Sequence, residues 1–286
     1  MKFPVIDFEL TSKCNLRCEF CFGPENGCDI FDLPTEVWFQ AIDYFWERGV
    51  KAIVFTGGEP TLRTDLYQIV SYAKQLGFMT ILSTNGRQHN ETVQCVDVLD
   101  WLCLPLDSTD TKINRKMRGD DWLLNSLAKL ILDSKKVNPS IKIKIGTVIS
   151  EVNVFEIGNI YNALLTIEDT VDIWKLYQCT YTPTSFRRFE KFAISTNNFL
   201  KIVNPIQDDF KGRRFKVTVS SIFDRRRAYV FVYPDGTVSI PDMGTNVNDL
   251  IIGNIGNLGS VCLDQDIQLD LKNMVSNFHA TYGFSF

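Results

Sequence analysis

Histidine is nearly absent from this sequence of 286 residues, and neither sign of charge dominates it. Only His89 and His279 occur, so a zinc site built on histidines or an acid/base site built on imidazole has little material. Lys and Arg number 30 against 34 Asp and Glu, which excludes the overall basic field typical of nucleic-acid-binding proteins. Nucleic acid is therefore not an expected partner.

Long apolar runs are also missing. No stretch reaches the length of a membrane span, and Asp7 and Glu9 interrupt the first apolar stretch, which is unlike a signal peptide. We therefore expect a cytoplasmic protein without a membrane span.

The eight cysteines are distributed unevenly. Cys14, Cys18 and Cys21 fall close together, whereas the other five are scattered along the chain. Without an export signal, cysteines are better interpreted as thiols or metal ligands than as disulfides. The close group predicts a metal or cluster site.

Strand-like and helix-like stretches alternate through the first two thirds of the chain. The expected strands cover 5–10, 51–55, 79–82, 101–106, 141–149 and 171–177. Helical patterns lie near 35–48, 64–76, 90–98, 121–136 and 154–166, with Gly49 and Gly77 as stops of the first two. Six β units joined by helical crossovers predict an α/β fold, a parallel sheet curled into a partial (β/α)6 barrel like part of a TIM barrel.

The pattern changes from about Ser185. A helix is expected at 195–210, then short strands at 215–220, 228–233 and 237–240, followed by a tail rich in Asn and Gly from 241. We therefore divide the chain into a partial barrel at 1–184 and a C-terminal α+β extension at 185–286.

Lysines interrupt two of the expected strands. In 141–146 the isoleucines share one face, so Lys142, Lys144 and Gly146 share the other. The isoleucines belong against the outer helices, which turns Lys144 toward the barrel interior, whereas Lys142 is expected in water at the bottom of the strand. Lys175 follows the pattern of Lys144. A polar cavity with a cationic wall is the result.

The three close cysteines follow the first strand directly as Cys14-x3-Cys18-x2-Cys21. Three thiolates at this spacing can hold one face of a [4Fe–4S] cluster and leave the fourth iron open, although such a loop alone also allows a zinc site. The loop resembles that of the radical S-adenosylmethionine (radical SAM) superfamily, in which an aromatic residue, here Phe20, precedes the last cysteine. The resemblance implies that these cysteines hold a [4Fe–4S] cluster whose open iron binds S-adenosylmethionine.

The segment Thr56-Gly57-Gly58-Glu59-Pro60 resembles the family's GGEP segment, in which freed backbone groups and the carboxylate meet the amino group of the methionine moiety. Its place after the second strand is at the carboxyl edge of the sheet, where barrel active sites form. By resemblance, the cofactor-binding residues are Phe20, Gly57, Gly58, Glu59, Ser83, Asn85, Ser108 and Arg118, with Gly146 beside the adenine.

The family's chemistry implies reductive cleavage of S-adenosylmethionine. An electron delivered to the cluster splits the cofactor into methionine and a 5′-deoxyadenosyl radical, which abstracts a hydrogen atom from an unactivated carbon. A flavodoxin- or ferredoxin-like partner would supply the electron. The protein contributes positioning and exclusion of water, which accounts for the scarcity of histidine.

Beyond the cluster loop, the chain is similar to the viperin family over roughly residues 3–200. Matching segments include Leu106-Asp107-Ser108, Arg118-Gly119, Lys142–Ile149 and Trp174–Cys179. The resemblance implies conversion of a nucleoside triphosphate to its 3′-deoxy-3′,4′-didehydro form. Lys144 and Lys175 are the expected substrate residues, because a triphosphate needs cationic walls.

Several segments depart from the viperin pattern. The first strand, Asp7-Phe8-Glu9-Leu10-Thr11, lacks the Asn and His of the equivalent viperin strand, and the carboxylates of Asp7 and Glu9 would repel a triphosphate. The turn Pro234-Asp235-Gly236 replaces a segment that supplies a tyrosine, and the chain ends at Phe286 without the family's tryptophan. These departures concern the substrate and leave the cofactor expectation unchanged.

Two other functions stay open. A radical SAM epimerase or modifying enzyme acting on a peptide or sugar would use Cys179 or Cys262 to return a hydrogen atom, although both also fit as buried apolar side chains. A non-catalytic iron–sulfur or zinc protein is disfavoured by the GGEP segment. The runs 213–214 and 225–227 of arginine could bind phosphate, but such runs are more often solvated.

Overall fold

The computed structural model describes residues 4–21, 32–121, 123–179, 190–209, 213–242, 249–261 and 271–282. The expected domain boundary at 184/185, the alternative hydrogen donor Cys262 and the end of the chain at Phe286 lie outside these residues.

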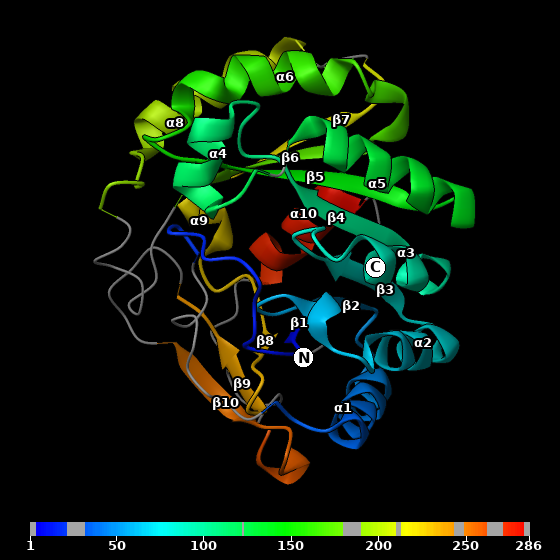
Figure 1. The fold of residues 1–286 in the computed structure, drawn as a ribbon. Helices are drawn as coiled ribbons and strands as arrows, with labels where there is room; N and C mark the ends of the chain where they lie inside the picture. Colours follow the sequence, from blue (N-terminus) through cyan, green and yellow to red (C-terminus); the bar gives the residue numbers. More distant parts are fainter. Residues whose placement is uncertain are drawn as a thin grey trace.

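Six parallel strands form the barrel wall, and the prediction of a partial α/β barrel is confirmed (Figure 1). They follow one another in chain order, each hydrogen-bonded to the next. Their bounds are β1 (Val5–Glu9), β2 (Ala52–Thr56), β3 (Met79–Ser83), β4 (Trp101–Pro105), β5 (Lys142–Ile149) and β6 (Ile173–Gln178). Each lies within two residues of the expected range, because near-continuous apolar runs mark buried parallel strands clearly.

Helices connect these strands on the outside of the sheet (Figure 1). They are α1 (Thr35–Glu47), α2 (Leu66–Leu76), α3 (His89–Cys95), α4 (Thr111–Arg118), α5 (Leu124–Val137) and α6 (Ile157–Leu165), with short 3-10 turns η1 (Pro60–Leu62), η2 (Val96–Val98), η3 (Val154–Glu156) and η4 (Glu168–Thr170). The sequence did not predict α4. The Asp110 carboxylate caps its start by accepting from the backbone N–H groups of Lys112 and Ile113, and Gly119, with a φ of 69°, ends it.

The C-terminal third extends the same sheet at both of its edges. Its elements are α8 (Thr196–Asp209), β7 (Lys216–Ser220), α9 (Ile222–Arg225), β8 (Phe231–Val232), β9 (Thr237–Ile240), β10 (Leu250–Asn254), η5 (Leu258–Ser260) and α10 (Leu271–Tyr282). β7 pairs with β6, whereas β8 pairs in parallel with β1 and is followed by the antiparallel β9 and β10. The Asn- and Gly-rich tail thus contains a strand and a helix that the sequence did not indicate.

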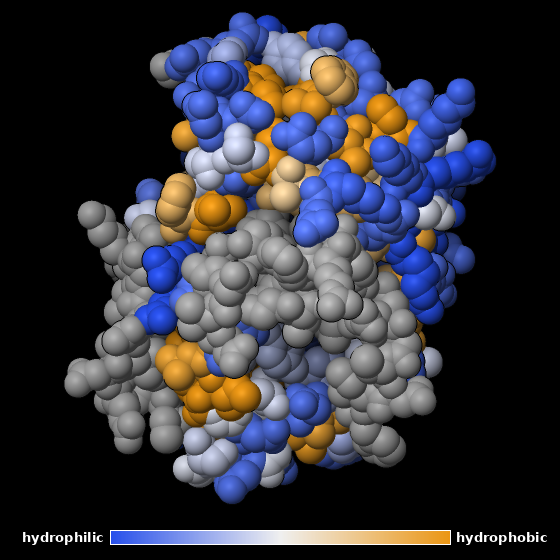
Figure 2. All heavy atoms as spheres, turned by 90° about the vertical axis from the view of Figure 1, so that its left-hand side faces the viewer, coloured by the Kyte–Doolittle hydropathy of each residue, from blue (hydrophilic) through white to orange (hydrophobic). Residues whose placement is uncertain are grey.

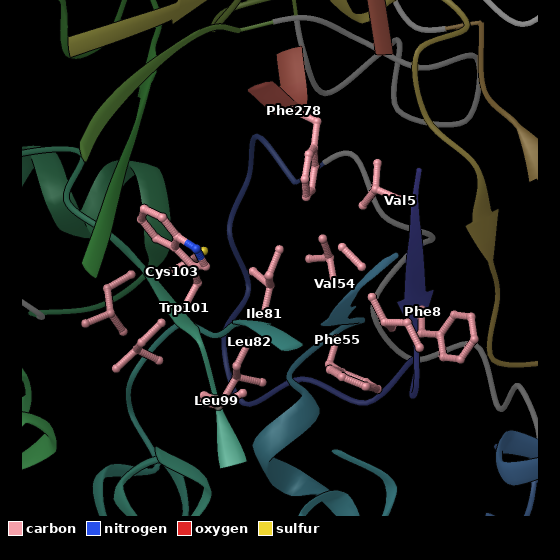
Figure 3. Close-up of a cluster of buried hydrophobic side chains, with 14 of the residues drawn as sticks. Val5, Phe8, Val54, Phe55, Ile81, Leu82, Leu99, Trp101, Cys103 and Phe278 are labelled. Carbon is pink, nitrogen blue, oxygen red and sulfur yellow. The ribbon is translucent and has the colours of Figure 1, made fainter. Parts of the chain in front are cut away.

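The inside of the barrel is partly apolar. Figure 3 shows Phe278 of α10 pointing toward Val5 of β1 and Val54 of β2, with Cys103 and Trp101 of β4 to one side. On β5, Ile143 and Ile145 are fully buried outward while Lys144 faces inward and Lys142 remains exposed, so the predicted alternation is confirmed. α10 therefore fills part of the barrel that the first six strands leave open.

The surface mixes hydrophilic side chains with smaller hydrophobic patches on the face seen in Figure 2. Large exposed apolar side chains include Phe155, Phe223 and Ile251. None of the helices in the described part of the chain has the length and apolar character needed to cross a membrane.

Candidate active site

One cavity of about 380 Å³ runs through the barrel interior, within the range of roughly 300–1,000 Å³ typical of small-molecule sites. At the carboxyl ends of the strands its wall contains Cys14, Cys18 and Cys21 together with Glu59. Other predicted site residues in the wall are Phe20, Gly58, Ser83, Asn85, Arg118, Lys144, Gly146, Lys175 and Cys179. The fold thus brings nearly all predicted site residues to one space.

The cysteine loop follows β1, and hydrogen-bond donors surround its sulfurs. The Leu16 N–H donates to Cys14 Sγ at 3.4 Å, and Asn85 Nδ2 lies 3.9 Å from the same sulfur. Arg118 Nη1 lies 4.0 Å from Cys18 Sγ. Burial raises the pKa of the Cys14 thiol and raises that of Cys18 to about 11, with Arg118 opposing the shift at Cys18. These thiolates therefore need a cationic partner such as iron.

The two glycines of the GGEP segment let its backbone lie against the cysteine loop. Gly58 N donates to Thr11 O at 2.7 Å, and Glu59 N donates to Lys13 O at 2.8 Å. A Cβ on Gly58 would stand 2.4 Å from Lys13 O, and one on Gly57, whose φ is +143°, would stand 2.6 Å from Thr11 O. Only glycine permits this contact. Gly57 itself is absent from the cavity wall formed by the described residues.

Glu59 is fully buried and held by donors from two strand ends. Its Oε1 accepts from the Thr61 N–H at 3.1 Å and from Thr84 Oγ1 at 2.6 Å, and its Oε2 accepts from the Asn85 N–H at 2.7 Å. Burial raises its pKa, and these hydrogen bonds lower it. A carboxylate oxygen can accept more than one hydrogen bond, so Oε2 keeps capacity for a further donor, and Glu59 lies in the cavity wall. No local sequence pattern indicates the hydrogen bonds that Thr61 and Thr84 donate to Glu59.

Ser83, the last residue of β3, and Asn85, two residues further on, lie in the cavity wall, but Ser108 does not lie in the wall formed by the described residues. The Ser108 hydroxyl is buried, donates to Glu156 Oε2 at 3.2 Å, and accepts from the Asp110 N–H at 2.9 Å. Ser108 therefore organises the turn into α4.

Arg118 joins the cysteine loop to the end of β4. Its Nε donates to Asp107 Oδ2, and its guanidinium carbon lies 5.2 Å from the centre of the Phe20 ring. Asp107 also accepts from the Val148 N–H at 2.7 Å, so β5 fixes its position. A cation is thereby held beside Cys18 and the cavity.

Residues 8–131 match the Radical SAM superfamily, whose cysteine loop, glycine turn and barrel are the features described above. The chain contains a radical SAM domain. The protein is therefore a radical SAM enzyme, of a family that uses a [4Fe–4S] cluster and S-adenosylmethionine.

Relatives with known names support the same family. The chain is 27% identical over 249 residues to an S-adenosylmethionine-dependent nucleotide dehydratase of Flammeovirga pacifica, covering 82% of this chain and 81% of that protein. A protein of the same name from Selenomonas ruminantium is 33% identical over 161 residues, covering 53% of this chain and 58% of the relative. Streptococcus suis SuiB bound to S-adenosylmethionine has the same fold, with a TM-score of 0.68 at 17% identity over 87% of this chain and 63% of SuiB.

The donor set of the radical SAM domain fits its cluster. In the described part of the chain, no three His, Cys, Asp or Glu side chains close around one point as ligands of a single metal ion would. A cluster instead distributes its cysteines over separate irons, and three thiols are the set that leaves one iron of four open. Cys14, Cys18 and Cys21 are the residues that would hold it.

The other half of the cavity is lined by charged and hydroxyl groups. The ammonium of Lys144 donates to the Tyr282 hydroxyl at 2.7 Å, and that of Lys175 donates to Thr281 Oγ1 at 2.7 Å. Burial and the charge of Lys144 lower the pKa of Lys175 to about 7, whereas the pKa of Lys144 is raised. Both lysines lie where the strand alternation placed them.

Sequence reasoning missed several residues of this half. Arg225 and Tyr229 lie in the cavity wall, whereas the sequence favoured a solvated face for the arginine run 225–227. The other two arginines of the run, Arg226 and Arg227, pair with Asp242 outside the cavity. Thr281 and Tyr282 come from the unpredicted α10. The arginine run was the only local signal for any of them.

Proposed function

We propose that this radical SAM enzyme is a nucleotide dehydratase that converts a nucleoside triphosphate to its 3′-deoxy-3′,4′-didehydro form. The observation that carries the proposal is that Lys144 and Lys175 share one cavity with the cysteine loop and Glu59. The Flammeovirga relative with this type of activity in its name aligns well beyond residues 8–131, into the part of the chain that supplies the cationic wall.

The two lysines suit a polyphosphate. Each ammonium carries three donors, and a hydroxyl of α10 accepts one of them, which leaves two on each lysine for phosphate oxygens. Charge-assisted hydrogen bonds of this kind are roughly twice as strong as neutral ones. Arg225 adds a third cation to the same wall.

The cofactor half positions its ligand through separate residues. We place the amino group of the methionine moiety at Glu59, its carboxylate near Arg118, the ribose near Ser83 and Asn85, and the adenine against Gly146. When bound, the cluster and S-adenosylmethionine supply the reductive chemistry that removes a hydrogen atom from the substrate. Apolar wall residues such as Val54, Leu104 and Phe278 exclude water around the substrate carbon. A flavodoxin- or ferredoxin-like protein is the proposed electron donor.

A second candidate, a peptide- or sugar-modifying enzyme, is favoured by one observation. The thiol of Cys179 is 3% exposed and lies in the cavity wall, as does that of Cys103. A thiol there could return a hydrogen atom to a substrate radical. Burial raises the pKa of Cys179 to about 12, so it remains a thiol.

The test is an anaerobic screen of the reconstituted enzyme with dithionite, S-adenosylmethionine and each of the four ribonucleoside triphosphates. We expect one triphosphate to increase 5′-deoxyadenosine release and to lose one water by mass spectrometry, with its monophosphate inactive. Turnover of none of the four, with 5′-deoxyadenosine formed only slowly, would contradict the proposal and favour the second candidate.

A further inference from the structure

The carboxyl group of Asp7 is buried in the cavity and has no hydrogen-bond or ion-pair partner among the residues that the structure describes. Asp7 lies in the middle of β1, next to Val54 of β2 and close to Phe231 of β8 in the sheet register, and all three line the cavity. It is 8% exposed. Among the described residues, no group donates a hydrogen bond to its carboxyl oxygens or forms an ion pair with them. A buried polar group without a partner is costly, so this carboxyl is set to meet a ligand.

The charges facing Asp7 come from several elements. Lys144 of β5 and Lys175 of β6 attract its ionised form, but burial outweighs them and raises its pKa to about 7. Other titratable groups around this part of the barrel are Glu9, Cys103, Tyr177, Arg225, Tyr229 and Tyr282. Asp7 is thus a carboxyl whose protonation state can change near neutral pH.

An arriving phosphate meets this carboxyl in one of two forms. An ionised Asp7 would repel it and cancel part of the attraction of the lysines. A neutral Asp7 would instead offer an O–H donor, and a hydrogen bond from O–H to an anionic oxygen is short and strong. A phosphate between Lys144 and Lys175 also adds negative charge, which favours the protonated form.

We propose that Asp7 binds the substrate as a neutral carboxylic acid that donates a hydrogen bond to a phosphate oxygen beside Lys144 and Lys175, so that substrate binding takes up a proton. This rests on the proposed function, which places the phosphates at the two lysines. Asp7, which lies in the strand that departs from the viperin pattern, would then be a specificity-determining residue for the phosphate group.

The experiment measures the dissociation constants of the four ribonucleoside triphosphates for the reconstituted enzyme, with S-adenosylmethionine present, between pH 7.5 and 9. In this range the nucleotide keeps a constant charge, because the last phosphate ionisation lies near pH 6. Each proton taken up makes binding about tenfold weaker per pH unit. We expect one to two such protons for the unmodified enzyme, from Asp7 and Lys175, and about one fewer for Asp7→Asn. At pH 8.5 Asp7→Asn should bind at least about tenfold more tightly than the unmodified enzyme.

Glu9→Gln is the matched control. Glu9 lies on the same strand, is 5% exposed, and burial raises its pKa to about 8, but it is not in the cavity wall of the described residues. It should keep the full pH dependence. Equal slopes for Asp7→Asn and the unmodified enzyme would overturn the role of Asp7.

Two further measurements keep the outcomes separate. If Lys144→Met binds triphosphate as tightly as the unmodified enzyme, the proposed phosphate position itself is wrong. If Asp7→Asn does not fold, Asp7→Ser and calorimetry of the unmodified enzyme in two buffers of different ionisation enthalpy replace it. No proton uptake on binding at pH 8 would then refute the proposal.

Discussion

The substitution Gly58→Ala should impair cluster binding without preventing the barrel from folding. In Gly58→Ala the new Cβ would stand 2.4 Å from Lys13 O and 2.7 Å from Ser12 O, both backbone atoms that cannot rotate away. The loop must retreat by about 1 Å to reach ordinary contact. That movement stretches the hydrogen bonds from Gly58 N to Thr11 O and from Glu59 N to Lys13 O.

The destabilisation of the cysteine loop by Gly58→Ala can be worked out from these contacts. Losing the two hydrogen bonds costs about 1 kcal/mol each and overpacking costs about 1–3 kcal/mol, so the cluster-binding arrangement of the loop is destabilised by roughly 3–5 kcal/mol. Cys14 directly follows Lys13 in the chain, so it moves with the loop. Since the helices and the rest of the sheet do not depend on this contact, the barrel should fold.

The assay compares iron and sulfide content after anaerobic reconstitution with thermal unfolding followed by circular dichroism. Gly58→Ala should hold less than half of the cluster while keeping its far-UV spectrum. The control is Gly158→Ala in α6, where a Cβ meets nothing within 4 Å and alanine should stabilise the helix by about 0.5–1 kcal/mol. Full cluster content and normal 5′-deoxyadenosine formation in Gly58→Ala would refute this reasoning.

Three other predictions concern the cavity. Lys144→Met should raise the KM for the triphosphate at least about tenfold, whereas Lys142→Met, on the same strand but exposed and paired with Asp172, should leave steady-state kinetics unchanged. Burial raises the pKa of Glu9 from 4.5 to about 8, so between these pH values the folded state keeps a proton that the unfolded state has lost. The free energy of unfolding therefore falls as the pH rises from about 4.5 to about 8. In denaturant titrations Glu9→Gln should therefore be more stable than the unmodified protein at pH 8.5, by roughly 1–4 kcal/mol, and equal to it below about pH 4.5; a constant difference at both pH values would argue against a buried neutral carboxyl. Cys179→Ala should keep triphosphate turnover within about threefold, and loss of product with continued 5′-deoxyadenosine release would favour the thiol-donor alternative.

The sequence by itself determined the features that depend on local spacing. The order of Cys14, Cys18 and Cys21 after the first strand, the paired glycines at 57–58 after the second, and the inward direction of Lys144 all follow from chain order and from the two-residue period of a strand. In a parallel barrel the carboxyl ends of all strands meet at one edge, so these local patterns suffice to bring the residues together.

Only the tertiary structure decided which residues complete the cavity. Thr281 and Tyr282 meet Lys175 and Lys144 across more than a hundred residues of sequence, and no local pattern specifies such a partner. Ser83 ends β3 and Ser108 comes shortly after β4, yet the Ser108 hydroxyl donates to Glu156 in the turn that leads into α4. Contacts of this kind depend on how separate elements pack, since each hydrogen bond needs a partner within about 3 Å whatever the distance along the chain.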